Sequence, residues 1–179
     1  MADGGLPSAQ AEWWYDHARC VAAILEETHG ILDQLKAKAQ EMNGQLKTKT
    51  SQFQNKEFKN ASMAMCALIA AADGSIDPSE RQKTAALIMS NESLAVFPPD
   101  ELREQFDWYC SKLSSDYEFG KVEATATIAK LKSKQDQARA VIQIGIIIGG
   151  ADGNFDEHER GVVRDMCFAV GISPAEFDL

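Results

Sequence analysis

The chain has 179 residues, of which 45% are hydrophobic, and its 18 basic and 27 acidic side chains give a formal net charge of −9. This length suffices for one sizeable hydrophobic core and does not require two domains. An acidic surface repels phosphates and oxyanions, so the composition argues against nucleic-acid binding and favours cations and basic partners.

The charge is distributed unevenly along the chain. Residues 1–33 carry one basic and six acidic side chains, and residues 34–59 carry six lysines and two acids. Residues 60–179 carry eleven basic and nineteen acidic side chains. We therefore expect an acidic main body preceded by a lysine-bearing stretch.

The N-terminal part is predicted to be one long helix over residues 11–46, because its apolar residues recur at alternating steps of three and four. The narrow apolar stripe fits either a coiled-coil seam or a helix packed on the domain. Trp13, Trp14 and the lysines of residues 34–59 would suit contact with anionic lipid or an acidic partner; the alternative is a solvated helix docked on its own domain. A polar connector follows, so we place domain boundaries at 1–52 and 53–179.

The rest of the chain is predicted to be helical throughout. Residues 141–148 contain enough β-branched side chains to form a buried strand. The residues that lead into the first copy of the repeated motif described below, 64–72, have no strand character. Ser133 and Asp136 also have the spacing of a helix start. We therefore predict a buried central helix there, apolar nearly all round. The residues that mark the helices are Phe58, Ala61, Met65, Leu68, Ile69 and Ala72; Ala85, Leu87 and Ile88; Leu102, Phe106, Cys110 and Leu113 after Pro98-Pro99-Asp100-Glu101; Phe119, Val122, Ala126 and Ala129; and Val162, Val163, Met166, Cys167 and Val170.

The chain end carries two further signals. Gly171 is predicted to stop the last long helix, and Ser173-Pro174-Ala175-Glu176 has the pattern of a capping box that begins one more turn. The predicted fold class is therefore all-α, a compact bundle of about seven helices preceded by the long N-terminal helix.

The four cysteines, Cys20, Cys66, Cys110 and Cys167, are far apart and form no C-x-x-C pair. They are predicted to be reduced, small hydrophobic side chains in a cytoplasmic protein. The N-terminus lacks the pattern of a signal peptide, and the longest apolar run, near residues 144–151, is too short to span a bilayer.

One acidic motif occurs twice. The pattern A-D-G-x-[I/F]-D-x-x-E-R begins at Ala72 and recurs 79 residues later at Ala151. Two copies with identical spacing, each after an apolar run, indicate an internal duplication of a helix-turn-helix unit. We expect the two units to place both acidic clusters on a shared face or cleft. The motif acids are Asp73, Asp77 and Glu80 in the first copy and Asp152, Asp156 and Glu159 in the second.

Helix capping explains part of this pattern. Gly74 and Gly153 are predicted to end the preceding helices in the left-handed conformation, and Asp77 and Asp156 to be N-caps. Pro78 would occupy the first helical position, and Glu80 and Glu159 would complete capping boxes. Capping leaves Asp73 and Asp152 unexplained, because a carboxylate in the last turn of a helix faces the negative end of the helix dipole.

A hard divalent cation would neutralise the negative charge of these acids. The acids of one copy are spaced so that the turn brings them to one side, where loop carbonyls complete an oxygen shell suited to calcium, magnesium or manganese. The spacing is not that of an EF-hand. Zinc is less suitable, because only His158 offers nitrogen and the first copy has Ser79 at that position. On spacing alone, metal binding and structural capping both stay open.

Beyond the motif, several segments resemble the tellurite-resistance protein TerB family over roughly residues 55–179. The segments that carry the resemblance are Asn55-Lys56-Glu57-Phe58, the helix with Cys66 leading into Ala72-Asp73-Gly74, Val96-Phe97, Phe119-Gly120-Lys121, Gly150-Ala151-Asp152-Gly153-Asn154-Phe155-Asp156 and Pro174-Ala175-Glu176-Phe177-Asp178-Leu179. The resemblance implies a small all-helical cytoplasmic protein of bacterial tellurite and stress resistance, with metal bound by the six motif acids. It also implies other resistance proteins and a membrane protein as partners, at the inner face of the membrane.

Two other classes of function, an enzyme and a structural scaffold, compete with a metal-binding module. A reductase would need a paired or activated cysteine, and a hydrolase would need a nucleophile, a base and oxyanion donors; the sequence shows neither set. A purely structural scaffold, whose acids are helix caps, is the plainer alternative. The sequence does not determine the oligomeric state.

Overall fold

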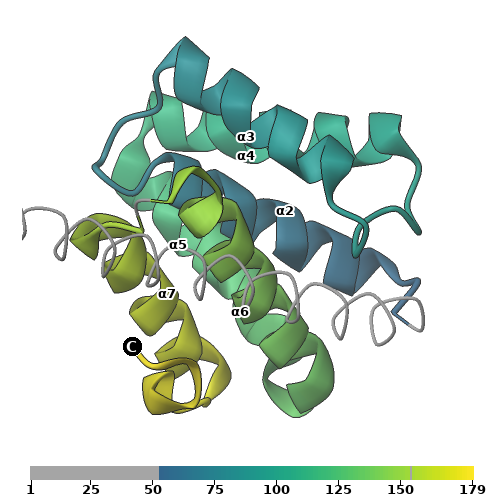
Figure 1. The fold of residues 1–179 in the computed structure, drawn as a ribbon, viewed down its shortest axis with the longest axis vertical. Coiled ribbons are helices and arrows are strands. Elements are labelled where there is room, and N and C mark those ends of the chain that lie inside the picture. The colour runs from purple at the N-terminus through teal and green to yellow at the C-terminus, as the bar shows by residue number, and fades with distance from the viewer. Residues whose placement is uncertain (1–52, 154) are drawn as a thin grey trace, which may run out of the picture. The chain divides into compact units, whose positions relative to one another are not determined.

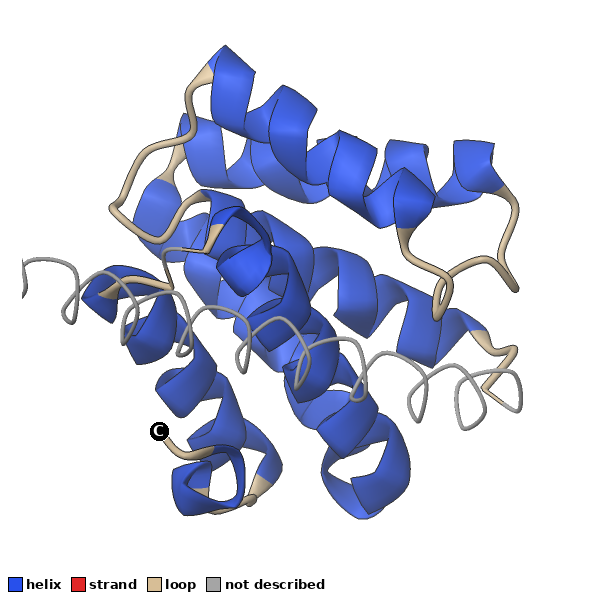
Figure 2. Cartoon of the chain, in the orientation of Figure 1, coloured by secondary structure: helices blue, strands red, loops and turns tan. Residues whose placement is uncertain are grey.

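The computed structural model describes residues 53–153 and 155–179, and every regular element in this part is a helix (Figure 2). The elements are α2 (Lys56–Ala70), α3 (Pro78–Ser90), α4 (Pro99–Ser115), α5 (Tyr117–Ala129), α6 (Gln135–Gly149) and α7 (Glu157–Val170), with the short 3-10 helices η1 (Lys130–Ser133), η2 (Gly150–Asp152) and η3 (Pro174–Phe177). The all-α prediction is confirmed. The predicted N-terminal helix, the boundary between 52 and 53, and Cys20 lie outside the described residues.

Helix α2 is the centre of the fold. It begins at the N-cap Asn55, whose side chain accepts the backbone N–H of Phe58 at 2.9 Å. Every residue from Ala61 to Ile69 is buried, and α2 packs against α4, α5 and α6 (Figure 1). Alternation of alanines with Met63, Met65 and Leu68 lets neighbouring helices approach α2 from several sides.

Residues 141–148 form part of α6, so the helical prediction for this β-branched run is confirmed. Its burial is less complete than predicted. Val141, Ile142, Ile144 and Ile148 are buried, whereas Ile146 and Ile147 are only partly buried against the core. The start of α6 also differs from the prediction, because Ser133 lies in η1 and the N-cap is Lys134, with no side-chain cap.

Helix α5 turns a different face to the core from the one its apolar residues indicate. The buried residues are Gly120, Ala124 and Ile128, whereas Phe119 and Val122 are 63% and 66% exposed. A Cβ at position 120 would lie 2.8 Å from the backbone Cα of Leu113. The glycine therefore lets the backbones of α4 and α5 approach closely, and this contact sets the rotation of α5.

The chain end is partly as predicted. Gly171 has a φ of 74° and ends α7 in the left-handed conformation. Residues 174–177 form one turn, η3, but the predicted capping box is absent because Ser173 makes no side-chain cap. Glu176 instead accepts hydrogen bonds from the Arg139 guanidinium of α6, the shorter at 2.9 Å.

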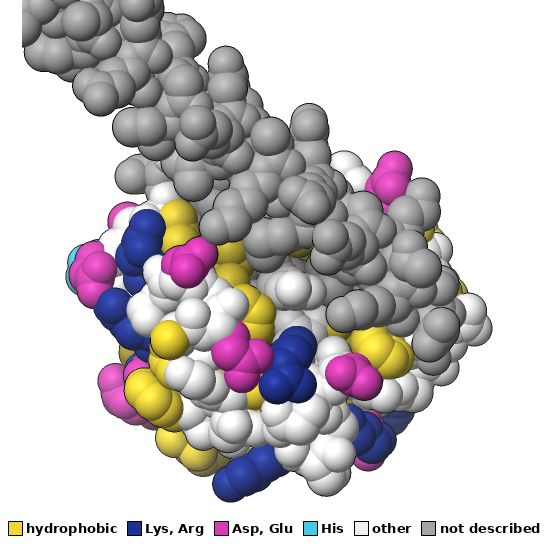
Figure 3. All heavy atoms as spheres, turned by 60° about the horizontal axis from the view of Figure 1, so that its bottom comes forward, with side chains coloured by type: hydrophobic (Ala, Val, Ile, Leu, Met, Phe, Trp, Pro, Cys, Tyr) yellow, Lys and Arg dark blue, Asp and Glu magenta, His cyan; other side chains and the backbone are white. Residues whose placement is uncertain are grey.

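Basic and acidic side chains are interspersed on the face shown in Figure 3. Ion pairs between helices include Arg81–Asp107 at 2.7 Å and Lys121–Asp165 at 3.1 Å. Such exposed pairs each contribute little, about 0–1 kcal/mol. Packing of the apolar helix faces therefore holds the bundle together.

The remaining predictions concern cysteines and membranes. Cys66, Cys110 and Cys167 are free and buried, as predicted. Among the described helices, none combines the length and apolar character needed to cross a membrane.

Candidate functional site

The first motif occupies the turn between α2 and α3. Gly74 has a φ of 93°, as the motif predicts. Because α2 ends at Ala70, Asp73 does not lie in the last helical turn, and the predicted conflict with the helix dipole does not arise. One Asp73 carboxylate oxygen accepts the backbone N–H of Ser75 at 3.0 Å and its hydroxyl at 3.1 Å. Asp73 is thus a hydrogen-bonded turn residue.

Asp77 is the N-cap of α3, as predicted. Its Oδ1 accepts the backbone N–H groups of Ser79 at 2.6 Å and Glu80 at 3.0 Å, and Glu80 Oε2 accepts the backbone N–H of Asp77 at 3.3 Å. Hydrogen bonds lower the pKa of Asp77. The backbone N–H of Glu80 has the largest effect, and the hydroxyl and backbone N–H of Ser79 come next. Capping therefore holds this exposed carboxyl in its charged form.

The second motif repeats this arrangement before α7. Gly153 has a φ of 85°. Asp156 Oδ1 accepts the backbone N–H of Glu159 at 2.9 Å, and Glu159 Oε2 accepts the backbone N–H of Asp156 at 3.0 Å. The backbone of Asp152 ends η2, and its side chain lies outside the described part. Both predicted capping boxes are confirmed.

Acids from both motifs line one pocket of about 240 Å³. Asp73 and Glu80 come from the first motif, and Asp156 and Glu159 from the second. Asp77 is not among the lining residues. The other residues that line the pocket are Ile69, Ala70, Ala72, Lys83, Thr84, Leu87, Ile148 and Gly149. The fold thus brings together acids that are more than seventy residues apart in the sequence.

These acids are not assembled as a finished metal site. Among the described residues, no group of three or more His, Cys, Asp or Glu side chains is arranged to hold a metal ion. Four carboxylates nevertheless surround one space, and Lys83 is the single lysine among the described residues that line it. Like charges gathered in this way favour the entry of a cation.

Two features of the site were not predicted from the sequence. Lys83 lies three residues after Glu80, so both side chains lie on one face of α3. This spacing is the sequence signal from which Lys83 could have been predicted at the site. Gly149 allows the close approach of Phe155, because a Cβ there would lie 2.9 Å from that ring and 3.3 Å from Glu159 Oε1. No sequence pattern predicts that Gly149 contacts the turn before α7.

Comparison with known proteins points to one family. A family model described as "Tellurite resistance protein TerB" matches residues 59–179. A "Tellurium resistance protein TerB" from Alcaligenes sp. is 30% identical over 116 residues, which cover 65% of this chain and 95% of that protein. No solved structure matches the chain.

Proposed function

The chain belongs to the tellurite resistance protein TerB family, and from this premise we propose that it is a non-enzymatic module that binds divalent cations. The binding residues of the proposal are Asp73, Asp77, Glu80, Asp152, Asp156 and Glu159. Family membership associates the protein with tellurite resistance. The observation that carries the cation proposal is that acids of both motifs line one pocket.

Capping is compatible with cation binding. In the capping boxes, Oδ1 of Asp77 and Asp156 and Oε2 of Glu80 and Glu159 accept backbone N–H groups. A carboxylate has two oxygens and about four lone-pair sites, so a capping carboxylate retains the capacity to ligate. Small rotations of exposed Asp73 and of the glutamates would complete a shell with loop carbonyls, which suits the flexible coordination of calcium.

The alternative is a structural scaffold whose motif acids serve only as helix caps. Both complete capping boxes and the local hydrogen bonds of Asp73 favour it. The alternative does not account for the convergence of four acids on one pocket, because capping stabilises each helix separately.

The duplicated unit is part of the proposal. The pairs α2–α3 and α6–α7 each have a left-handed glycine after the first helix and a capping box at the second. This likeness supports descent from one helix-turn-helix unit, with the shared pocket between the two copies.

We extend the proposal to the setting of the protein. Calcium, magnesium or manganese would be the ligand, with zinc less suitable because oxygen donors predominate. The partners would be other tellurite-resistance and stress proteins, including a membrane protein, with the chain in the cytoplasm or at the inner face of the membrane. Peripheral contact through the N-terminal region, which lies outside the described residues, stays a prediction.

Calorimetric titration of the full chain with calcium, magnesium, manganese and zinc tests this proposal. One shared site predicts that Asp73→Asn and Glu159→Gln each weaken the same binding event, whereas two separate sites predict that each variant removes one of two events. A control variant, Glu118→Gln, changes an exposed acid of α5 that does not line the pocket, and should bind as the wild type does. Absence of heat with all four cations would favour the scaffold.

A further inference from the structure

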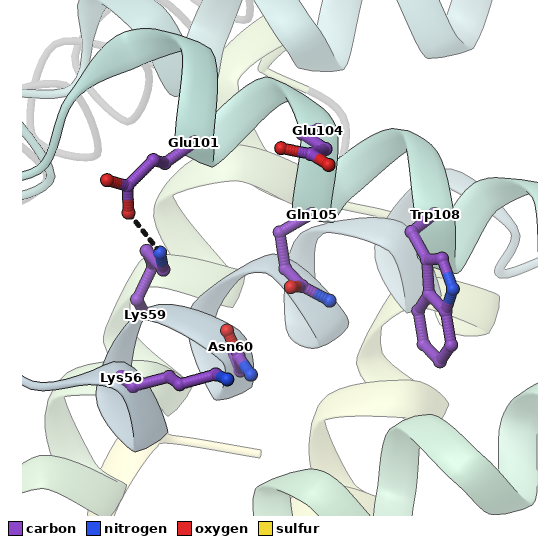
Figure 4. A pocket seen from close by; sticks show the side chains of 7 residues that line it. All are labelled: Lys56, Lys59, Asn60, Glu101, Glu104, Gln105 and Trp108. Carbon is purple, nitrogen blue, oxygen red and sulfur yellow. Dashed lines mark hydrogen bonds and ion pairs between the residues drawn. The ribbon is translucent and has the colours of Figure 1, made fainter.

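A second pocket, of about 450 Å³, lies between the start of α2 and the first three turns of α4. Lys56, Lys59 and Asn60 of α2 line one side (Figure 4). The residues on the α4 side are Glu101, Glu104, Gln105 and Trp108. Their spacing of three and four residues places them on one face of each helix. None of the motif acids whose side chains the structure describes lines this pocket, and it shares no described lining residue with the site above.

The charges around this pocket balance. Lys59 and Glu101 form an ion pair that joins α2 to α4 at one end of the pocket (Figure 4). Lys56 and Glu104 contribute one further charge of each sign. A divalent cation or a polyphosphate would gain nothing net from such a surface, so the chemistry favours a neutral ligand.

Asn60 supplies a hydrogen-bond acceptor that is unused within the described part of the protein. Its Oδ1 is buried, and no described group donates to it. Leaving such an oxygen without a donor is unfavourable. A rotation of the Asn60 side chain that turns this oxygen toward the pocket would let a ligand hydroxyl provide the missing bond. The Gln105 carboxamide in the same pocket can both donate and accept.

Trp108 provides the apolar wall of this pocket. It is 41% exposed, although its ring is positioned by an edge contact with Tyr109, with 4.8 Å between the centroids. The Lys112 ammonium lies over the ring, 5.0 Å from its centroid, so a ligand would contact the opposite face. An indole held in place yet accessible is suited to contact with weakly positive C–H groups, because the face of the ring is electron-rich.

From these observations, we propose that the pocket between α2 and α4 binds a neutral sugar, a mono- or disaccharide. Its C–H face lies on Trp108, and its hydroxyls donate to Asn60, exchange hydrogen bonds with Gln105 and accept from the Lys56 ammonium. Among the described residues that line the pocket, Trp108 is the only aromatic one and none is aliphatic. A nucleobase binds best between two apolar faces, and this set of side chains offers only one. A sugar has one apolar face, which suits Trp108, and a rim of hydroxyls, which suits the polar side chains.

Nuclear magnetic resonance of the full chain tests the proposal through the side-chain amide signals of Asn60 and Gln105 and the indole N–H of Trp108. The probes are glucose, galactose, N-acetylglucosamine and maltose, with adenosine and phenylalanine as ligands of other classes. The indole signal is assigned by its loss in Trp108→Ala, because the chain also has Trp13 and Trp14. At least one sugar should shift all three signals with a Kd on the order of 1 mM.

Variants separate binding from folding. Trp108→Ala should weaken sugar binding at least tenfold, whereas Phe119→Ala, which removes an exposed aromatic of α5, should bind as the wild type does. Asn60→Leu should lose binding while its Tm stays unchanged or rises, because the variant removes a buried polar oxygen. The proposal is overturned if no sugar moves these signals, if Trp108→Ala binds sugar as tightly as the wild type, or if only adenosine or phenylalanine produces the shifts.

Discussion

Asp156 shows how much a single cap contributes to this fold. Its carboxylate accepts the backbone N–H of Glu159 at 2.9 Å at the start of α7. We expect Asp156→Ala to lower the free energy of unfolding by about 1 kcal/mol in the presence of chelator, because this N–H loses its partner. Asp156→Asn should retain most of the stability, since asparagine caps about as well. Urea unfolding of the three proteins measures the difference, and equal stability of Asp156→Ala and wild type would contradict the capping role.

Asp77 makes the stability of α3 dependent on pH. Its folded-state pKa is lowered by the N–H groups and hydroxyl that it accepts, so it lies below the unfolded value of about 3.9. The ionised carboxyl therefore stabilises the fold above pH of about 3.9, and this contribution is lost as the pH falls through the folded-state pKa. The stability difference between wild type and Asp77→Asn should shrink on acidification from pH 6 to pH 3. A stability difference that grows as the pH falls would contradict the stabilising role of the ionised Asp77 carboxyl.

The buried thiols are expected to be unreactive in the folded protein. Burial raises the pKa of Cys110 to about 12 and that of Cys167 to about 11, and it raises the pKa of Cys66 further. In a Cys20→Ser variant, a disulfide reagent at pH 8 should find almost no thiol until denaturant is added, when all three should react. Fast reaction of one thiol in the native state would instead indicate an activated cysteine.

At the scale of elements, the contact of α4 with α5 depends on Gly120. A Cβ at this position would lie 2.8 Å from the backbone of Leu113, which cannot move as a side-chain end can. We expect Gly120→Ala to cost about 1–3 kcal/mol through overpacking. Gly161→Ala is the matched control, because Gly161 lies within α7 with nothing within 4 Å of its Cβ position, and alanine should stabilise that helix by about 0.5–1 kcal/mol. Thermal unfolding compares the two, and a tolerated Gly120→Ala would contradict the close approach.

The same helix shows why the sequence predicts elements better than it predicts their faces. Caps and left-handed glycines act within one turn, so the starts of α3, α4 and α7 followed from Asp77, Pro99 and Asp156. The rotation of α5 depends instead on Gly120 against α4, a contact between separate helices. The apolar residues Phe119 and Val122 therefore marked the helix correctly, but they do not lie on its buried face.

At the scale of the whole molecule, the candidate site follows from how α2–α3 and α6–α7 pack. The sequence identified the motif acids, because their spacing repeats, and it indicated a duplicated unit. It also predicted a shared face or cleft for the two acidic clusters, but it could not show which acids line it. Asp73, Glu80, Asp156 and Glu159 do so through the packing of α2 and α3 against α6. The sequence misplaced Asp73 in a helical turn, because α2 ends at Ala70, earlier than its apolar pattern indicates.

Thermal unfolding with excess chelator and with excess calcium tests the cation proposal most directly, in the wild type and in the double variant Asp73→Asn with Asp152→Asn. The account predicts that calcium stabilises the wild type, by about 2.7 kcal/mol at a hundredfold excess over Kd, because the ligand binds only the folded form. The double variant should be about as stable as the wild type in chelator, since asparagine at position 73 can still accept the Ser75 hydrogen bonds, and it should gain little from calcium. If no divalent cation stabilises the wild type while the variant is less stable in chelator, the motif acids are structural and the cation proposal is wrong.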